Sequence, residues 1–385
     1  MQIRALSAID EIAPARWNAL TGTDNPFLRH EFLAALERHG AVSADNGWVP
    51  HHLVLEDGDT LVAAAPAYLK GNSWGEFVFD FAWAHAYERN GLDYYPKLII
   101  AVPYSPVNGP RMLINGDYPM EGARQALADG ARQVVDALDI SSVHWLFAND
   151  ADMTELEAAG YSRRDGCQYH WRNAGYHDFD DFLGGLNAKK RKNIRRERRR
   201  VDEQGLTLRT LHGDEMSPEL WTALHGFYVD TFLAHGNRPV ITRDCFVELG
   251  DQLGDRLVAF VAEADGEPVA AAICLRSGDT LYGRYWGAAA EYDDLHFEAC
   301  YYQGIEYCIR EGMDRFEPGA QGEHKVARGF LPVLTHSAHH LRDDRFQAAV
   351  DDFLARERPA VAEYADTLTA EGPYRADVLE TLPRG

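Results

Sequence analysis

The stretch DGDTLVAAAPAYL at residues 57–69 indicates a duplicated fold, because a related stretch, DGEPVAAAICL, occupies residues 265–275 of the same 385-residue chain. Both consist of an acidic-Gly turn followed by Val-Ala-Ala-Ala, and the two VAAA runs begin 207 residues apart. A strand-like run precedes each turn, HHLVLE at 51–56 and LVAFVAEA at 257–264. An Asp-Gly pair between two such runs is typical of a β-hairpin. The repeat therefore predicts two structural copies in tandem.

The surroundings of the two hairpins repeat as well. Two helix-like segments precede each hairpin, and a helix and a further strand follow it; they lie at 14–20, 29–40, 121–138 and 141–147 in the first copy and at 218–235, 243–253, 297–312 and 314–320 in the second. This order is typical of an α+β fold. We therefore expect two domains, 1–175 and 176–385, each with a mixed, largely antiparallel sheet flanked by helices. A C-terminal amphipathic helix at 343–367 is expected to pack on the second domain.

The run KKRKNIRRERRR, residues 189–200, is the strongest charge feature of the chain. Nine of its twelve residues are Lys or Arg and one is Glu197, so the run carries +8 in a chain whose net charge is −22. Flanking apolar residues recur at helical spacing and predict a helix at 188–204. Like charges on one helix repel one another, and a bound anion relieves that repulsion. The candidate phosphate-binding residues are Lys189, Arg191, Lys192 and Arg195. The alternatives are a solvated helix face and acids elsewhere in the chain that fold back on the run.

Several classes of protein are disfavoured by what the sequence lacks. Its five cysteines are scattered without a C-x-x-C pair, which argues against a disulfide framework or a zinc site. The histidines at 336, 339 and 340 have no matching set of carboxylates or thiolates, so no metal is expected. The sequence contains no P-loop, no dinucleotide-binding G-x-G-x-x-G and no nucleophile elbow. It also has no secretory leader and no apolar run of membrane-spanning length, so a cytoplasmic protein is expected.

The motif Lys189-x-Arg191-x-Asn193-Ile194-Arg195 resembles the K-x-R-x-N-I-R signature of the FemAB-type aminoacyltransferases. The segment FEPGAQGEHK at 316–325 is similar to the strand-turn close of that family. With SPVNGPRML at 105–113 and GRYWG at 283–287, nearly the whole chain resembles a proteobacterial FemAB-like branch of peptidoglycan biosynthesis or recognition. The resemblance implies two tandem GNAT-like domains and transfer of an aminoacyl or acyl group to an amine, for which a cell-wall precursor is a candidate.

The identity of the donor stays open at this level. GNAT acetyltransferases hold the pyrophosphate of CoA at a helix N-terminus through an R/Q-x-x-G-x-G/A turn. No such turn precedes either candidate helix, and the connection GAAAEYDDLH at 287–296 carries three acids. The resemblance implies aminoacyl-tRNA or acyl-CoA as the donor substrate, and it implies no resident cofactor. A non-catalytic protein that recognises peptidoglycan or RNA is the alternative from another class.

The loop at 319–325 carries the groups that acyl transfer needs. Glu323 or His324 can accept the proton of the amine, and Lys325 can stabilise a developing oxyanion. Tyr301 and Tyr302 are candidate proton donors to the leaving group, as tyrosine is in many GNAT enzymes, and Tyr302 is the one assigned to catalysis; core packing is the alternative for at least one of them. The candidate substrate contacts nearby are Gln321, Arg328, Arg284 and Trp286. The alternatives are a structural ion pair of Glu323 with Lys325 or Arg328, and a structural salt bridge of Arg284.

In the first half, PYSPVNGPRML at 103–113 connects a strand to a helix, at the position where this fold places its ligand turn. Tyr104, Asn108 and Arg111 are therefore candidate acceptor contacts. A rigid exposed loop is the alternative reading of the same residues.

Overall fold

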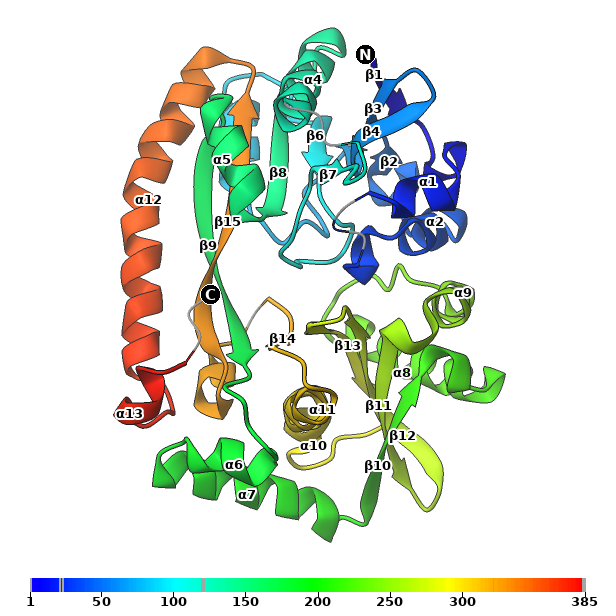
Figure 1. The fold of residues 1–385 in the computed structure, drawn as a ribbon, viewed down its shortest axis with the longest axis vertical. Helices are drawn as coiled ribbons and strands as arrows, with labels where there is room; N and C mark the ends of the chain where they lie inside the picture. Colours follow the sequence, from blue (N-terminus) through cyan, green and yellow to red (C-terminus); the bar gives the residue numbers. More distant parts are fainter. Residues whose placement is uncertain (1, 21, 23, 119–121, 321, 383–385) are drawn as a thin grey trace. The chain divides into compact units, whose positions relative to one another are not determined.

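The computed structural model describes residues 2–382 except 21, 23, 119–121 and 321. The chain forms two compact units (Figure 1). Unit 1 comprises Met1–Cys167 and Leu334–Tyr364, and unit 2 comprises Gln168–Val333 and Ala365–Gly385. This division differs from the expected one chiefly at the C-terminal end. Residues 334–364, which include most of the C-terminal helix expected on the second domain, belong to unit 1.

Unit 1 is an α+β unit with two sheets. The first has the order β1-β3-β4-β7, and the second runs β15-β8-β6-β5-β2, with β6 and β8 parallel. The elements of this part of the chain are β1 (Gln2–Leu6), α1 (Pro14–Asn18), α2 (His30–Arg38), β2 (Trp48–Pro50), β3 (His52–Asp57), β4 (Thr60–Ala65), β5 (Ala67–Lys70), α3 (Phe81–Arg89), β6 (Lys97–Ile100), β7 (Leu113–Ile114), α4 (Ala123–Ala137), β8 (Ser142–Ala148), α5 (Asp150–Ala158) and β9 (Ser162–Arg172).

Unit 2 has a sheet of the order β10-β11-β12-β13-β14-β9, in which β13 and β14 are parallel. Strands β9 and β15 and helix α12 each contribute residues to both units. The elements of this part of the chain are α6 (Phe179–Gly184), α7 (Ala188–Glu203), β10 (Leu206–His212), α8 (Pro218–Ala234), α9 (Arg243–Leu253), β11 (Leu257–Ala264), β12 (Glu267–Arg276), β13 (Thr280–Ala288), α10 (Leu295–Phe297), the π-helix η6 (Glu298–Tyr302), α11 (Gln303–Glu311), β14 (Arg315–Glu317), the 3₁₀ helix η7 (Glu323–Arg328), β15 (Leu331–Leu341), α12 (Asp344–Ala370) and α13 (Ala376–Leu379).

The two predicted hairpins are present as β3-β4 and β11-β12, and both are antiparallel. Each contains a β-bulge at the corresponding place. In the first hairpin the pairing passes from Leu55↔Ala63 to Glu56↔Leu61 and leaves Val62 unpaired. In the second it skips Val269 in the same way. Because a bulge is a specific local feature, its recurrence 207 residues later confirms that the two hairpins are structural counterparts.

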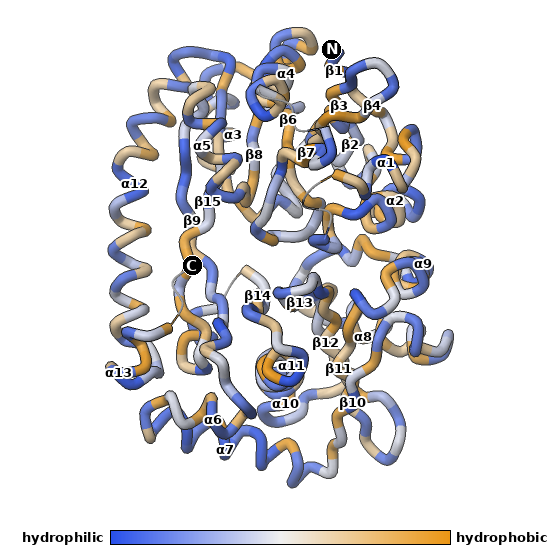
Figure 2. Tube along the Cα trace, in the orientation of Figure 1, coloured by the Kyte–Doolittle hydropathy of each residue, from blue (hydrophilic) through white to orange (hydrophobic). Residues whose placement is uncertain are grey.

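Each unit has its own apolar core. In unit 1, helix α4 packs its buried face on β3 and β4, and every residue of β8 is buried. In unit 2, α11 and η6 pack against β11, β12 and β13. Figure 2 shows hydrophilic residues along most of α7, where Ile194 and Val201 are the two buried side chains. Helix α7 is therefore held on unit 2 by few apolar contacts, and its polar contacts must contribute the rest.

Two lysines lie directly opposite each other in the sheet of unit 1. Lys70 on β5 pairs in register with Lys97 on β6, and both side chains are fully buried. Lys97 Nζ lies 2.8 Å from Glu76 Oε2 and also donates to Asp80. Like charges across a strand pair destabilise a sheet, and a buried charge is tolerated when it is paired. The two carboxylates therefore offset the charge of Lys97, whereas burial lowers the pKa of Lys70 to about 7 and favours its neutral form.

These lysines also fix the loop that follows β5. Lys70 Nζ donates to the backbone oxygen of Trp74 at 3.0 Å, and Lys97 Nζ donates to Ser73 Oγ at 2.9 Å. The loop held in this way exposes Trp74 and Phe79, whose exposed fractions are 68% and 56%. The sequence does not predict this loop, because no periodic pattern marks a loop that is held by buried charges.

Candidate active site

A cavity of ≈ 300 Å³ opens in unit 2 where the pairing of β13 with β14 ends. The two strands pair in parallel only at Thr280–Tyr282. Beyond this point β13 continues to Ala288, whereas β14 ends at Glu317 and the loop that follows it lines the cavity, an arrangement that leaves room for a ligand beside the sheet. The residues that line the cavity are Ala272, Ile273, Cys274, Gly283, Arg284, Tyr285, Trp286, His296, Cys300, Tyr301, Pro318, Gly319, Ala320, His324 and Lys325.

Lys325 is the buried ammonium group of this cavity. It lies on η7 with an exposed fraction of 3%, and its Nζ donates to the backbone oxygen of Gly319 at 2.7 Å. Burial lowers the pKa of Lys325 to about 7, and the charge of Arg284 acts in the same direction. An amine with this pKa can gain or lose its proton near neutral pH. Such a group is suited to proton transfer or to stabilising the charge of a transition state.

His324 and Tyr301 form a polar pair at the rim of the cavity. The hydroxyl of Tyr301, on η6, lies 2.8 Å from Nε2 of His324. Burial, together with the charges of Arg328 and Lys325, lowers the pKa of His324 below its ordinary value of 6.5. The imidazole is therefore neutral at pH 7. In the tautomer that donates from Nε2 to Tyr301, Nδ1 is available as a proton acceptor.

Arg284 brings a second cationic group to the cavity. The pairing of β12 with β13 passes from Ile273↔Tyr285 to Cys274↔Gly283, so Arg284 is the extra residue of a β-bulge. Bulges redirect side chains and are frequent beside active sites. Burial lowers the pKa of Arg284, although it stays a cation at any physiological pH. With Lys325, it makes the cavity suited to an anionic group or to a developing oxyanion.

The predicted residues of this region are only partly brought together. His324, Lys325, Arg284 and Trp286 line the cavity, and their roles in catalysis or substrate binding remain predictions. Glu323 is exposed and does not line it. Gln321 lies outside the described residues.

Tyr302 and Arg328 face helix α7 and do not line this cavity. Tyr302 is fully buried and donates a hydrogen bond to Glu197. Arg328 forms an ion pair with the same carboxylate at 3.0 Å. Of the two adjacent tyrosines on η6, the one that lines the cavity is therefore Tyr301.

The candidates in the first half lie in unit 1, in the connection between β6 and β7. The Tyr104 hydroxyl donates to the Ala41 oxygen at 2.9 Å, and Asn108 is half-buried. Arg111 is fully buried, and its guanidinium donates to the oxygens of Leu146 and Pro110 at 2.8 and 3.0 Å. Arg111 thus fixes the backbone of its own loop, and a contact with an acceptor remains a prediction for all three residues.

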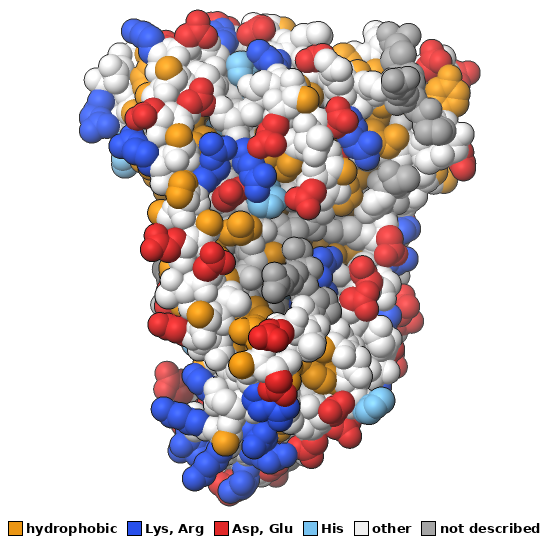
Figure 3. All heavy atoms as spheres, turned by 60° about the vertical axis from the view of Figure 1, so that its left-hand side comes forward, with side chains coloured by type: hydrophobic (Ala, Val, Ile, Leu, Met, Phe, Trp, Pro, Cys, Tyr) orange, Lys and Arg blue, Asp and Glu red, His pale blue; other side chains and the backbone are white. Residues whose placement is uncertain are grey.

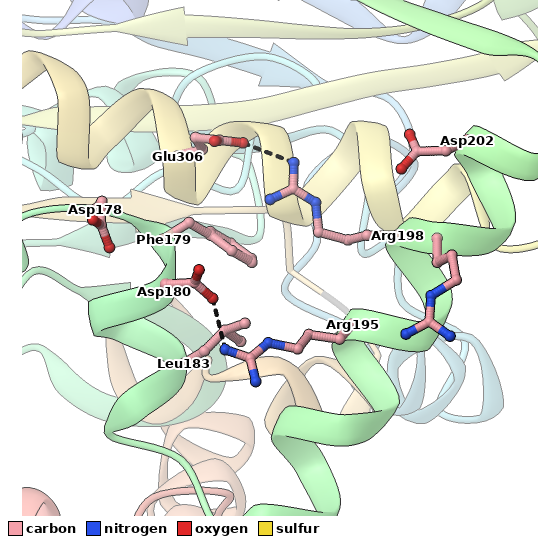
Figure 4. A pocket seen from close by; sticks show the side chains of 9 residues that line it. Asp178, Phe179, Asp180, Leu183, Arg195, Arg198, Asp202 and Glu306 are labelled. Atoms are coloured by element: carbon pink, nitrogen blue, oxygen red, sulfur yellow. Dashed lines mark hydrogen bonds and ion pairs between the residues drawn. The ribbon is translucent and has the colours of Figure 1, made fainter.

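Helix α7 begins after Asn187, whose Oδ1 accepts a hydrogen bond from the backbone N–H of Lys190. Ion pairs hold the helix against the rest of unit 2. Arg198 pairs with Glu298 and Glu306 at 3.0 and 2.8 Å, and Arg195 pairs with Asp180 at 2.8 Å. Figure 4 shows Arg195 and Arg198 reaching across a groove between α6, α7 and α11 towards Asp180 and Glu306. Part of the basic run is therefore neutralised by acids of unit 2, which corresponds to the alternative in which acids elsewhere in the chain fold back on the run.

Four cations of α7 form a separate group, which we call the outer stripe: Lys189, Lys192, Arg196 and Arg199. Their spacing of three, four and three residues places them on one face of the helix, and all four are exposed. Within the part of the chain that the structure describes, none of them forms an ion pair. Figure 3 shows Lys and Arg side chains gathered at the bottom of the view, where Figure 1 places α7. Of the predicted phosphate contacts, Lys189 and Lys192 belong to the stripe, Arg195 is paired, and Arg191 donates to the Leu186 oxygen at 3.3 Å.

The residues described contain no group of three or more His, Cys, Asp and Glu side chains that could hold a metal ion. Of the three histidines considered above, His339 Nδ1 lies 2.8 Å from His144 Nδ1, and His336 pairs with Asp165 at 2.8 Å. Among the described helices, none combines the length and apolarity that crossing a membrane requires.

A family model described as FemAB-like, peptidoglycan biosynthesis/recognition, matches residues 8–376. No curated protein matches the sequence. Among solved structures, FemX is 12% identical with a TM-score of 0.54 over 91% of this chain and 100% of that chain. L-PGS from Bacillus licheniformis is 12% identical (0.51; 84% and 95%), and a conserved protein of unknown function from Bacteroides thetaiotaomicron is 12% identical (0.52; 88% and 99%). These likenesses concern the fold, and they confirm two tandem GNAT-like domains.

Proposed function

Because this chain belongs to the FemAB-like family, we propose that it is an N-acyltransferase that passes an aminoacyl or acyl group to an amine. The observation that carries the proposal is the cavity in unit 2, in which a neutral imidazole and two cationic side chains line one space. Acyl transfer needs a proton acceptor for the amine, a stabilised oxyanion and close positioning of both substrates. The description of the family makes the amine of a cell-wall precursor the favoured acceptor.

Each cavity residue has a defined task in this reaction. The amine nitrogen attacks the carbonyl carbon of the donor, a C–N bond forms, and His324 Nδ1 accepts the amine proton. Lys325 and Arg284 stabilise the negative charge that develops on the carbonyl oxygen. The ester or thioester bond of the donor then breaks, and the leaving oxygen or sulfur takes a proton from Tyr301. The proton held by His324 restores the Tyr301 hydroxyl through their hydrogen bond.

The cations of helix α7 favour a donor substrate that carries phosphate groups, and we propose that this donor is aminoacyl-tRNA. Successive cations of the outer stripe are separated by about 4.5–6 Å along the helix axis, which suits the repeated phosphates of a nucleic-acid backbone. By contrast, the helical segment that starts at Leu295 has Asp294 at its N-terminus, paired with Arg200 at 3.2 Å. A carboxylate at this position opposes the pyrophosphate of an acyl-CoA, which a helix N-terminus would otherwise attract.

The proposal is tested by incubating the protein with radiolabelled bulk aminoacyl-tRNA or with labelled acetyl-CoA, in the presence of an amine-bearing cell-wall precursor. We expect label to enter the acceptor as an amide from aminoacyl-tRNA. Lys325→Met should lower the rate by about 10²–10³-fold, and Arg356→Ala on α12 serves as a folded control. If label were transferred only from acetyl-CoA, the donor would be an acyl-CoA and not aminoacyl-tRNA. If neither donor supported transfer and the purified protein retained RNA or peptidoglycan fragments, the proposal of an enzyme would fail. The protein would then be a non-catalytic recognition protein.

A further inference from the structure

Glu197 is the one acid in the basic run, and its side chain points inward, away from the outer stripe. Its carboxylate accepts two hydrogen bonds from Arg328, from Nη2 to Oε1 at 3.0 Å and from Nε to Oε2 at 3.2 Å. The Tyr302 hydroxyl donates to the same carboxylate. The exposed fractions of the Glu197 and Arg328 side chains are 12% and 10%. A forked, shielded pair of this kind is among the stronger ion pairs in proteins.

Arg328 links this contact to the backbone beside the cavity. Its Nη1 donates to the backbone oxygen of His324 at 2.9 Å, and its guanidinium lies 3.4 Å from the centre of the Phe297 ring. Nothing in this arrangement reaches the cavity itself, because neither Glu197 nor Arg328 lines it. The guanidinium therefore acts on the backbone that carries His324 and Lys325.

The segment that holds these two residues needs such an anchor. Helix η7 is a short 3₁₀ segment bounded by Gly322 and Gly329, whose φ angles of +111° and +99° lie in a region that glycine adopts freely. Glycine on both sides allows the backbone many alternative conformations, and 3₁₀ hydrogen bonds are weak. A fixed external contact is therefore required to hold His324 against Tyr301.

We infer that Glu197 is a positioning residue, which holds η7 through Arg328 so that His324 and Lys325 stay aligned in the cavity. The role of η7 in catalysis rests on the proposed function, whereas the anchoring itself does not. Glu197 follows Arg196 and precedes Arg199 of the outer stripe on the same helix. Helix α7 therefore carries both the outer stripe, where a ligand binds, and Glu197, which holds the segment with the cavity residues.

The test compares Glu197→Gln with Glu306→Gln in the full-length protein. Both variants remove one carboxylate that pairs with a cation from the same region, but Glu306 pairs with Arg198 and, among the described residues, forms no hydrogen bond or ion pair with η7. Hydrogen exchange of the amides at 322–330 should rise at least about 10-fold in Glu197→Gln and stay at the wild-type rate in Glu306→Gln. In the transfer assay, kcat should fall in Glu197→Gln with KM for the donor nearly unchanged, and Glu197→Asp should restore part of kcat.

Wild-type exchange at 322–330 in a folded Glu197→Gln protein would overturn the inference, and so would an equal rise in both variants. If Glu197→Gln does not fold, Arg328→Lys decides, because lysine keeps the charge but loses the forked geometry. The same rise in exchange is then expected, and its absence overturns the inference. If the wild-type protein transfers no acyl group, the proposed function fails, while the exchange comparison still decides whether Glu197 anchors η7.

Discussion

The hydroxyl of Tyr301 lies 2.8 Å from Nε2 of His324, and both side chains line the cavity of unit 2. Because burial raises the pKa of Tyr301, this hydroxyl keeps its proton at neutral pH until a leaving group takes it. Tyr301→Phe removes that proton while keeping the ring. We expect kcat for acyl transfer to fall by about 10²-fold, in the range of lost acid-base catalysis.

Stability separates this catalytic effect from a structural one. Loss of one hydrogen bond should change the free energy of unfolding by about 1 kcal/mol, which urea denaturation measures. A fall in kcat that appears only together with a large loss of stability would contradict the assignment of Tyr301. Unchanged kcat in a stable Tyr301→Phe protein would contradict it as well.

The duplicated fold could be predicted from the sequence, whereas the exchange of segments between the units could not. The Asp-Gly turns and the VAAA runs are local patterns, and local patterns specify a hairpin well. By contrast, no local sequence pattern shows on which unit a C-terminal helix packs. Most of this helix, Asp344–Tyr364, belongs to unit 1 and not to unit 2. That choice depends on contacts between residues far apart in the chain, such as the ion pair of Arg164 with Glu357 at 2.8 Å.

The candidate site was predictable by residue type but not by orientation. The Gly-rich loop marked His324 and Lys325, because glycines beside titratable groups are a recognisable signal. The sequence does not distinguish Tyr301 from Tyr302, because nothing in it marks the π-helix on which both lie. Glu197 was counted only as the single acid of a basic run. Its role depends on a partner 131 residues away, which no spacing rule indicates.

The rate of transfer should depend on pH in a bell-shaped manner. His324 must be neutral to accept a proton, so the rate rises as pH passes its lowered pKa, below 6.5. Lys325 must be charged to stabilise the oxyanion, so the rate falls above its pKa of about 7. Lys325→Arg stays charged and should lose the alkaline decrease, which the profile of kcat/KM tests. A wild-type rate that increases through pH 7 to 9 would instead make neutral Lys325 the base.

Lys325 should also make stability depend on pH. Between about 7 and 10 the unfolded chain binds a proton at this lysine and the folded protein does not, so the free energy of unfolding increases with pH. Relative to Lys325→Met, the wild-type protein should gain about 1.4 kcal/mol per pH unit in this range and nothing below pH 7. Urea denaturation of both proteins at several pH values measures the difference. Parallel curves would show that the lysine is not buried as a neutral amine.

Lys97 should be essential for the stability of unit 1. Lys97→Met leaves Glu76 and Asp80 as buried carboxylates without their cation, and breaking a buried pair in this way costs about 3–5 kcal/mol. The exposed Lys192→Met on α7 should change the free energy of unfolding by less than about 0.5 kcal/mol. Adding Glu76→Gln to Lys97→Met should recover part of the loss. Equal stability of Lys97→Met and wild type, measured by urea denaturation, would contradict the pairing of these charges.

The outer stripe should account for binding of a polyphosphate ligand. Replacing Lys189, Lys192, Arg196 and Arg199 by alanine removes four cations that have no ion pair among the described residues. With bulk tRNA as the probe, the slope of log K against log salt should become shallower by about 0.7–0.9 for each phosphate that the protein no longer neutralises, or by about three in total. Fluorescence titration at several salt concentrations measures this slope.

The matched control removes the same charge elsewhere, by alanine at the exposed arginines Arg209, Arg345, Arg356 and Arg375. Each of these is already paired with an acid of the chain, so its charge is not available to a phosphate. The control should therefore keep the wild-type slope, although both quadruple variants have the same net charge. If both variants lost affinity equally, the binding would follow net charge alone. The stripe would then hold no localised ligand, and the choice of tRNA as donor would lose its support.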